Sequence, residues 1–237
     1  MVAAVTFDFW NTLVSTDPVA ARARRSAVWS ELFASTSTPL DPPVVDALID
    51  RLAERFDASW RGGSLYGLDS AVADVVELVG CDPDLAPSLE AAWTAAARCT
   101  QVEAAPGAAE VLAELRRRRV PVGMVCDVGL TPSPMLRHYL DRLGLADLIT
   151  ACAFSDEVGC YKPDPLMFKT ALGALGVEPH EAVHVGDLRR TDVAGARAMG
   201  MTAVRYRGLA DDSAADLPDG HHVIVDHAEL LPTLGLV

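Results

Sequence analysis

The strongest constraint on this sequence is a change of hydrophobic spacing near residue 100. Between residues 16 and 100, apolar side chains recur at intervals of three and four, as at Val45, Leu48 and Ile49. This spacing predicts amphipathic helices. Asp17-Pro18 and Asp41-Pro42 are typical helix starts, and glycines at 62, 63 and 80 divide the block, so we expect three or four helices.

From residue 106 onward, short apolar runs alternate with helical patterns. We expect helices at 108–118, 135–143, 165–175 and 193–199, and strands at 120–125, 149–154, 182–185, 202–204 and 222–225. Residues 2–7 read as a first strand of the same sheet. The predicted fold is therefore α/β: a Rossmann-like, doubly wound parallel sheet (residues 1–15 and 101–237) with an inserted all-helical cap domain (residues 16–100).

Composition excludes several classes of function. The net charge of −13 argues against nucleic acid, whose phosphates are bound by clustered Lys and Arg. No apolar run approaches the roughly 18 residues of a membrane span, and the N-terminus lacks a signal-peptide pattern. Five cysteines form no CxxC pair, so we expect reduced thiols and a cytoplasmic protein.

Polar side chains follow several predicted strands. Asp8 and Asp187 each come directly after an apolar run, as does the pair Cys126-Asp127, and Lys162 lies in a loop between a strand and a helix. Each residue alone could be a helix cap or a solvated loop residue. Ligands of open parallel sheets bind beyond the carboxyl ends of the strands, where these carboxylates would repel one another without a cation. Magnesium or a lysine would satisfy that arrangement.

These residues also carry a family resemblance. The segments Phe7-Asp-Phe-Trp-Asn-Thr-Leu13, Pro106-Gly107, Gly159-Cys-Tyr-Lys-Pro-Asp-Pro165 and His184-Val-Gly-Asp187 with Asp192 occur in that order. Together they resemble the motifs of the haloacid-dehalogenase (HAD)-like hydrolase superfamily, in which a helical cap follows the first motif. The resemblance covers residues 1 to about 15 and about 103 to 208.

The resemblance implies a set of catalytic roles. Asp8 would attack the substrate and form a covalent aspartyl intermediate that water hydrolyses. Lys162 would hold Asp8 and the transferring group in line, and Thr12 would support the loop of the nucleophile. The implied enzyme is a phosphatase acting on a small phosphorylated metabolite.

The resemblance also implies a cofactor, Mg²⁺, and a substrate pocket. The metal ligands would be Asp8, the backbone carbonyl of Trp10, Asp187 and, directly or through water, Asp192. Residues implied or proposed to contact the substrate are Trp10, Asn11, Cys126, Asp127 and, from the cap, Arg61. Arg61 is a candidate because it precedes Gly62-Gly63, although a surface salt bridge is the simpler interpretation.

Two features of the sequence depart from the family pattern. Trp10 stands where phosphatases of the family carry an Asp that protonates the leaving oxygen, and Cys126-Asp127 replaces Ser or Thr followed by Asn. Indole cannot supply that proton, and general acid catalysis is typically worth ~10²- to 10⁴-fold. One hypothesis is that Asp127 replaces the missing acid; the alternative is that it stabilises its loop.

Three functions therefore stay open. Trp10 favours a 2-haloacid dehalogenase, which carries an aromatic residue there, whereas Asp187 favours the phosphatase. A binding protein on a degenerate hydrolase fold is the non-catalytic alternative. We expect a monomer or homodimer whose partner is a small molecule, with neither nucleic acid nor membrane involved.

Overall fold

The computed structural model describes residues 2–214 and 216–236, and the chain divides into two compact units. The core unit comprises Met1–Ser15, Glu103–Asp127 and Leu140–Val237. The helical unit comprises Thr16–Val102 and Val128–Tyr139. The segment Val128–Tyr139, which begins α6 (Ser133–Arg142), thus clusters with the inserted helices.

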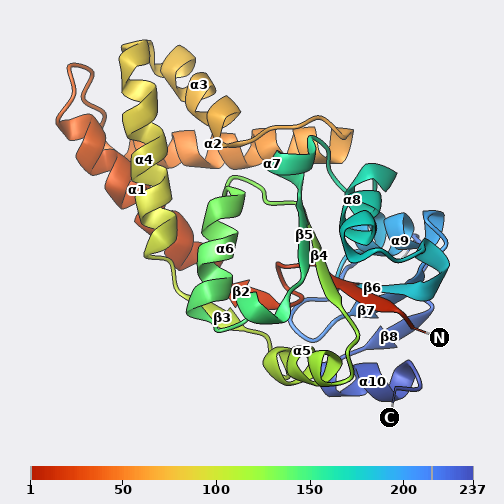
Figure 1. Ribbon diagram of the computed structural model, residues 1–237. Helices are drawn as coiled ribbons and strands as arrows, with labels where there is room; N and C mark the ends of the chain where they lie inside the picture. The colour runs from red at the N-terminus through yellow and green to blue at the C-terminus, as the bar shows by residue number, and fades with distance from the viewer. Residues whose placement is uncertain (1, 215, 237) are drawn as a thin grey trace. The chain divides into compact units, whose positions relative to one another are not determined.

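A six-stranded parallel sheet forms the centre of the core unit (Figure 1). Its strands, in spatial order, are β5 (Ala151–Phe154), β4 (Val122–Cys126), β1 (Ala4–Phe7), β6 (Ala182–Gly186), β7 (Thr202–Tyr206) and β8 (His222–Ile224). Each was predicted from its apolar run, with ends that differ by at most two residues. The predicted α/β class is confirmed.

Both faces of the sheet are covered, which explains why its inner strands are apolar throughout. Successive strand residues point to opposite faces. On one face, Gly123 of β4, which pairs with Thr6 of β1, lies against Leu175. On the other face, the ring of Phe7, which follows Thr6 on β1, lies 6.1 Å from the ring of His227. The helices of the core unit are α5 (Ala108–Arg117), α7 (Ser155–Val158), α8 (Pro165–Leu175), α9 (Ala194–Ala198) and α10 (Leu230–Thr233).

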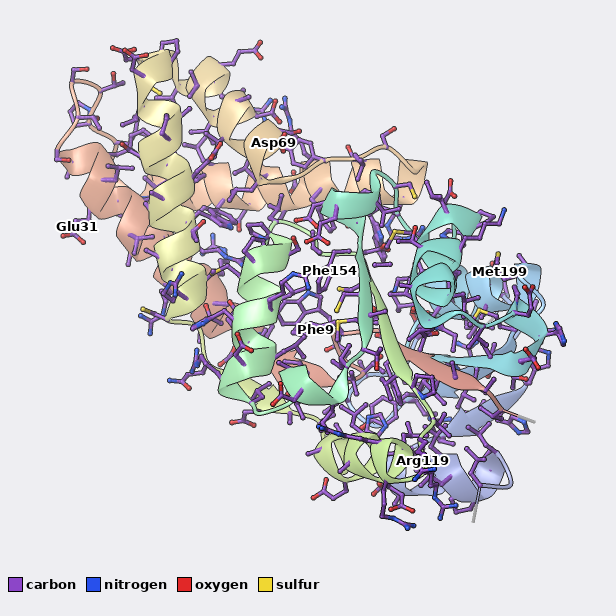
Figure 2. The ribbon with its side chains drawn as sticks, in the orientation of Figure 1. Phe9, Glu31, Asp69, Arg119, Phe154 and Met199 are labelled. Carbon is purple, nitrogen blue, oxygen red and sulfur yellow. The ribbon has the colours of Figure 1, made fainter. Side chains whose placement is uncertain are left out.

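Aromatic side chains fill the interior of this unit. Phe9 and Phe154 are both fully buried and point inward between the sheet and its helices (Figure 2). Burying an aromatic ring removes roughly 150–250 Å² of surface from water. Phe154, the last residue of β5, and Phe9, two residues after the end of β1, therefore anchor the chain where it leaves these strands.

The helical unit contains α1 (Pro18–Ala34), α2 (Pro42–Gly62), α3 (Leu68–Val79) and α4 (Ala86–Arg98). The Asp17 side chain caps α1 by accepting hydrogen bonds from the backbone of Val19 and Ala20. Gly63 and Gly80 end α2 and α3 in the left-handed conformation, at the breaks that the glycines predict. Trp29 and Trp93, with ring centroids 4.9 Å apart, lie in its apolar core.

Two short strands, β2 (Val14–Thr16) and β3 (Val102–Ala104), form a separate two-stranded sheet. Neither was predicted, because three residues are too few to show an alternating pattern. No helix among the described residues has both the length and the apolar character needed to cross a membrane.

Candidate active site

The loops that follow β1, β4 and β6 leave the same edge of the sheet. β1 lies between the other two strands, with Phe7 paired to Met124 on one side and to Val185 on the other. The next residues along the chain include Asp8 after β1 and Asp187 after β6, and both carboxyl groups are buried. Parallel pairing thus brings together two acidic groups that are far apart in the sequence.

Lys162 connects the acidic groups. Its Nζ lies 2.6 Å from Oδ1 of Asp8 and 2.6 Å from Oδ1 of Asp192, and only 3% of the residue is exposed. Lys162 lies in the turn between α7 and α8. One buried ammonium therefore serves two buried carboxylates, and a third, Asp187, is close to them.

The pKa values of these groups reflect an excess of negative charge. Burial, and next the repulsion from Asp8 and Asp192, raises the pKa of Asp187 to about 8. Burial also raises the pKa of Asp8 to about 7, although Lys162 opposes the shift. For Asp192 burial is outweighed by Lys162 and His184, which hold its pKa below the usual range. In the absence of a further cation, the site is incompletely neutralised.

This donor set fits a hard divalent cation. Asp8, Asp187 and Asp192 each offer a carboxylate oxygen, and these three atoms lie within 4.8 Å of one another. Carboxylates are the ligands that Mg²⁺ prefers, with water completing its octahedron. A bound cation would also relieve the repulsion that raises the pKa values of Asp8 and Asp187.

The position of Asp192 is tightly determined. Its Oδ2 accepts hydrogen bonds from the backbone N–H of Leu188 and the hydroxyl of Thr191, both at 3.1 Å. Its Oδ1 lies 3.0 Å from Nε2 of His184, whose Nδ1 is 2.9 Å from Oγ1 of Thr6. Burial lowers the pKa of His184, so a neutral ring that donates from Nε2 and accepts from Thr6 satisfies both contacts.

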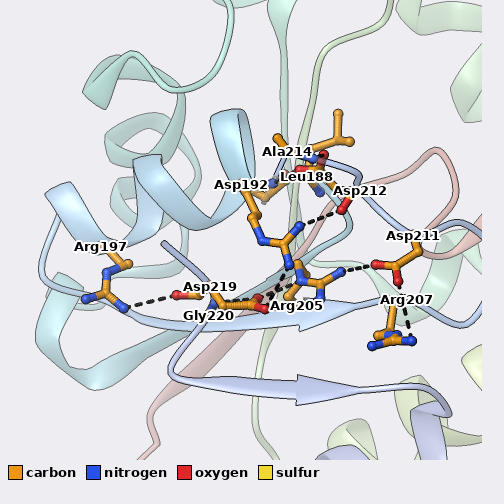
Figure 3. Close-up of polar contacts among 11 residues, drawn as sticks. Leu188, Asp192, Arg197, Arg205, Arg207, Asp211, Asp212, Ala214, Asp219 and Gly220 are labelled. Atoms are coloured by element: carbon orange, nitrogen blue, oxygen red, sulfur yellow. Dashed lines mark hydrogen bonds and ion pairs between the residues drawn. The ribbon is translucent and has the colours of Figure 1, made fainter. Parts of the chain in front are cut away.

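The segment that carries Asp192 is a π-helix, Arg189–Val193, and ion pairs fix it to the chain after β7 (Figure 3). The backbone N–H of Arg189 donates to Oδ2 of Asp212 at 2.7 Å, and its side chain contacts Asp219 at 3.1 Å. Arg205, buried on β7, donates to Asp219 and Asp211, each at 2.6 Å. The acidic segment after β7, which contains Asp211, Asp212 and Asp219, is thus tied to the segment that carries Asp192.

Residues near Asp8 in sequence have different surroundings. Oγ1 of Thr12 is buried 3.4 Å from Oδ2 of Asp8, a long hydrogen bond. Trp10 is partly buried, with its ring edge-on to Phe9 at 4.7 Å between centroids. Asn11 is exposed and adopts φ of 56°, a left-handed conformation that asparagine tolerates. The geometry therefore gives Asn11 a role in the turn.

The residues at the end of β4 lie beside the lysine. Oδ1 of Asp127 accepts a hydrogen bond of 2.9 Å from the backbone N–H of Lys162. Cys126 is fully buried, and burial, with the charge of Asp8, raises the pKa of its thiol. Arg61, the residue proposed from the helical unit, forms an ion pair of 2.7 Å with Asp57, and its side chain is 63% exposed. The simpler interpretation of Arg61 thus describes its observed contact.

One contact of the site has no counterpart in the sequence pattern. Nε2 of His227 lies 2.9 Å from the backbone carbonyl of Thr12, and its ring stacks on Tyr206 at 4.3 Å between centroids. His227 is fully buried near the C-terminus, 215 residues from Thr12. His227 therefore binds the turn that follows Asp8, and it lies on the face of the sheet to which the side chain of Phe7 points. Only the placement of its short segment between apolar residues hints that it is buried.

An α/β fold whose parallel sheet ends in this set of three aspartates and a lysine matches one group of hydrolases. The family model for haloacid dehalogenase-like hydrolases matches residues 2–200. The chain belongs to this family, and the predicted membership is confirmed.

Individual relatives include both phosphatases and dehalogenases. A glyceraldehyde 3-phosphate phosphatase of Methanopyrus kandleri is 30% identical over 227 residues, 92% of each chain. A phosphoserine phosphatase of Thermus thermophilus is 34% identical over 175 residues, 69% of this chain and 68% of that one. Among solved structures, a 2-haloacid dehalogenase from Pseudomonas syringae pv. Tomato DC3000 superposes with a TM-score of 0.72 at 26% identity, covering 99% of both chains.

Proposed function

We propose that this hydrolase is a magnesium-dependent phosphatase of a small phosphorylated metabolite, with Asp8 as the nucleophile. The observation that carries the proposal is the cluster of Asp8, Asp187 and Asp192 around Lys162. A dehalogenase reaction on a 2-haloacid needs no metal, whereas three buried carboxylates with one lysine are one divalent cation short of neutrality. The names of the two sequence relatives described above agree with this choice.

In the first step, a carboxylate oxygen of Asp8 attacks the phosphorus while the bond from phosphorus to the alcohol oxygen breaks. The alcohol leaves with the bonding electrons and takes a proton from an acid or from water. Water then attacks the phosphorus of the aspartyl phosphate, the bond to Asp8 breaks, and inorganic phosphate leaves. The carboxylate is restored, so one water is consumed for each ester.

The surrounding residues position and neutralise the reacting groups. Lys162 holds Oδ1 of Asp8 and would counter charge on the phosphoryl oxygens. Asp187 and Asp192, together with Asp8 and the carbonyl of Trp10, would hold Mg²⁺. When bound, the ion would supply charge neutralisation for the phosphoryl group and keep Asp8 ionised at neutral pH.

Asp127 acts in this proposal as a positioning residue. Its carboxylate accepts a hydrogen bond from the backbone N–H of Lys162, so it positions the segment that carries the lysine. The leaving alcohol then has no acid at Trp10, and we expect esters with acidic alcohols to be hydrolysed fastest.

The test is phosphate release from a panel of small phosphate esters, with Mg²⁺ or with chelator. The original protein should release phosphate only with Mg²⁺. The Asp8→Asn variant should lose at least ~10³-fold in rate, since the nucleophile is removed, whereas Asp141→Asn, a change at an exposed residue of α6, should behave as the original. Equal rates with and without chelator would contradict the metal requirement.

Trp10 supports a second candidate, the dehalogenase, because an aromatic side chain occupies the position of the phosphatase acid. The corresponding measurement is chloride release from 2-chloropropionate in chelator. Release that is lost in Asp8→Asn, without phosphate release from any ester, would replace the phosphatase by this function. No turnover of either substrate class would leave a binding protein on the same fold.

A further inference from the structure

The helical unit contains one largely buried cation whose charge has no carboxylate partner. Arg25, on α1, places its guanidinium carbon 4.8 Å from the ring centroid of Trp93, and its Nη2 donates to Oγ1 of Thr131 at 3.2 Å. Its Nε is buried without a hydrogen-bond partner. Within residues 2–214 and 216–236, no acidic side chain acts on Arg25, so its charge is balanced only by neutral groups.

Three other arginines of the same unit are paired. Arg22 forms ion pairs with Asp46 and Asp50, Arg55 with Asp74, and Arg61 with Asp57. These pairs lie at the surface, where a missing partner would cost little. Arg25 lacks such a pair although its guanidinium is more withdrawn from water than these three, the reverse of what stability alone would select.

Leaving Arg25 in this state is energetically costly. A buried donor without an acceptor loses its water without replacement, and a buried charge loses more. Burial also lowers the pKa of this guanidinium, the direction expected when no anion compensates the lost hydration. Native proteins rarely retain such a group unless water, an ion or a ligand satisfies it.

The position of Arg25 is fixed by its surroundings. Nε1 of Trp93 donates to the carbonyl of Leu130 at 2.8 Å, and the hydroxyl of Tyr139 donates to the carbonyl of Ala97 at 2.6 Å. Both bonds fasten the segment 128–139, which starts directly after Asp127 in the chain, to α4. The two groups that contact the guanidinium, the ring of Trp93 and the hydroxyl of Thr131, therefore lie on segments that are fastened to each other.

We propose that Arg25 is an anion-binding residue and takes a carboxylate or phosphate group of a small ligand. A planar guanidinium held against an indole ring offers a fork of N–H donors that matches two oxygens of such a group. The anion has two possible sources: a second charged group of the phosphorylated substrate, or a separate free anion. Only the first source rests on the proposed phosphatase function.

The first arm of the test needs no turnover. Melting is followed with and without malonate, at constant ionic strength set by NaCl, for the original protein, Arg25→Met and Arg24→Met. Arg24 is exposed on the same helix, and its substitution by Met removes the same charge as Arg25→Met. Malonate at saturating concentration should raise Tm by about 3 °C in the original and in Arg24→Met, and by less than about 1 °C in Arg25→Met.

The second arm asks whether the substrate supplies the anion. The ratio of kcat/KM for 2-phosphoglycolate to that for ethyl phosphate compares esters with and without a carboxylate. In Arg25→Met this ratio should fall about tenfold or more, through KM, and in Arg24→Met it should stay within twofold. If Arg25→Met does not fold, as judged by circular dichroism, Arg25→Lys should keep part of the malonate effect because the charge remains.

The outcomes separate the two proposals. A malonate effect that requires Arg25 supports the anion site even if no ester is hydrolysed, in which case the phosphatase proposal fails alone. A malonate effect with an unchanged ratio assigns the site to a free anion. Equal responses of Arg25→Met and Arg24→Met in both arms, in folded proteins, would overturn the proposal.

Discussion

At Asp8 and Asp187 the fold works against the proposed chemistry: burial favours the neutral carboxyl groups, whereas the reaction needs them ionised. Parallel pairing of β1 and β6 brings them into one buried site, and burial, with repulsion from neighbouring carboxylates, raises their pKa values to about 7 and about 8. A carboxylate nucleophile must be ionised at neutral pH. In the proposed reaction, a bound cation would therefore have a stabilising role in addition to a chemical one.

This conflict predicts an unusual dependence of stability on pH in the metal-free protein. A carboxyl whose pKa is raised on folding binds its proton more tightly in the folded state, so the free energy of unfolding should fall as pH rises from about 4 to about 8. Asp187→Asn removes one of the two groups. In chelator at pH 8 the variant should be more stable than the original by on the order of 2 kcal/mol, or roughly 4–8 °C in Tm.

At about pH 4, close to the ordinary pKa of an aspartic acid, the difference between the two proteins should nearly vanish. Saturating Mg²⁺ at pH 8 should stabilise the original protein more than the variant, reversing the order. Melting curves at the two pH values, each with Mg²⁺ or with chelator, measure all four quantities. A difference in Tm between Asp187→Asn and the original protein that does not grow with pH would show that ionised Asp187 does not destabilise the metal-free protein.

Asp127 permits a test at the same scale. As an acceptor for the N–H of Lys162 it can be replaced by the isosteric amide, whose oxygen also accepts. Asp127→Asn should keep kcat/KM within about threefold with an unchanged pH profile, whereas Asp127→Ala should lose about tenfold or more. Kinetics of both variants from pH 5 to 9 decide the matter: loss of the alkaline limb of the pH profile in Asp127→Asn would restore the proton-donor hypothesis.

Among the elements, the junction from β6 to the π-helix Arg189–Val193 carries the greatest constraint. Gly186 ends β6, and a Cβ built on it would lie 2.3 Å from Cγ of Asp192. The Asp192 carboxylate cannot easily move, since Lys162 and His184 bind one oxygen and the loop binds the other. The lack of a side chain at Gly186 is what allows Asp192 to approach β6.

Gly186→Ala should therefore displace Asp192 and its contact with Lys162. We expect kcat/KM to fall by on the order of 10²-fold, together with a loss of about 1–3 kcal/mol in stability from overpacking. Gly173→Ala is the matched control, because a Cβ there meets nothing within 4 Å and the residue lies inside α8. The control should be as active as the original and slightly more stable; equal activity of Gly186→Ala would remove Asp192 from the proposed site.

At the scale of the whole molecule, sequence reasoning succeeds where a signal is local. The six core strands were predicted because each apolar run is flanked by polar or turn residues, and Asp8, Asp187 and Lys162 were singled out by their place after such runs. Parallel pairing then makes their proximity a consequence of topology. The roles assigned to these residues stay predictions until they are measured.

What sequence reasoning missed depends on contacts between distant segments. His227 reaches Thr12 across 215 residues, and no local pattern predicts that contact. Arg61 was proposed because it precedes two glycines, but the presence of Asp57 one turn away decides its contact. The burial of Arg25 beside Trp93 depends on the packing of α1 against α4, which spacing along one helix cannot reveal.

The central claim, that Asp8 carries the phosphoryl group between two half-reactions, has a direct test. The protein is mixed with its fastest ester and Mg²⁺, quenched in acid within the first turnover, and digested for mass spectrometry. We predict a phosphoryl group on the peptide that contains Asp8, absent with chelator and in Asp8→Asn. A phosphoryl group on a different residue, or phosphate release by Asp8→Asn at the original rate, would contradict the account.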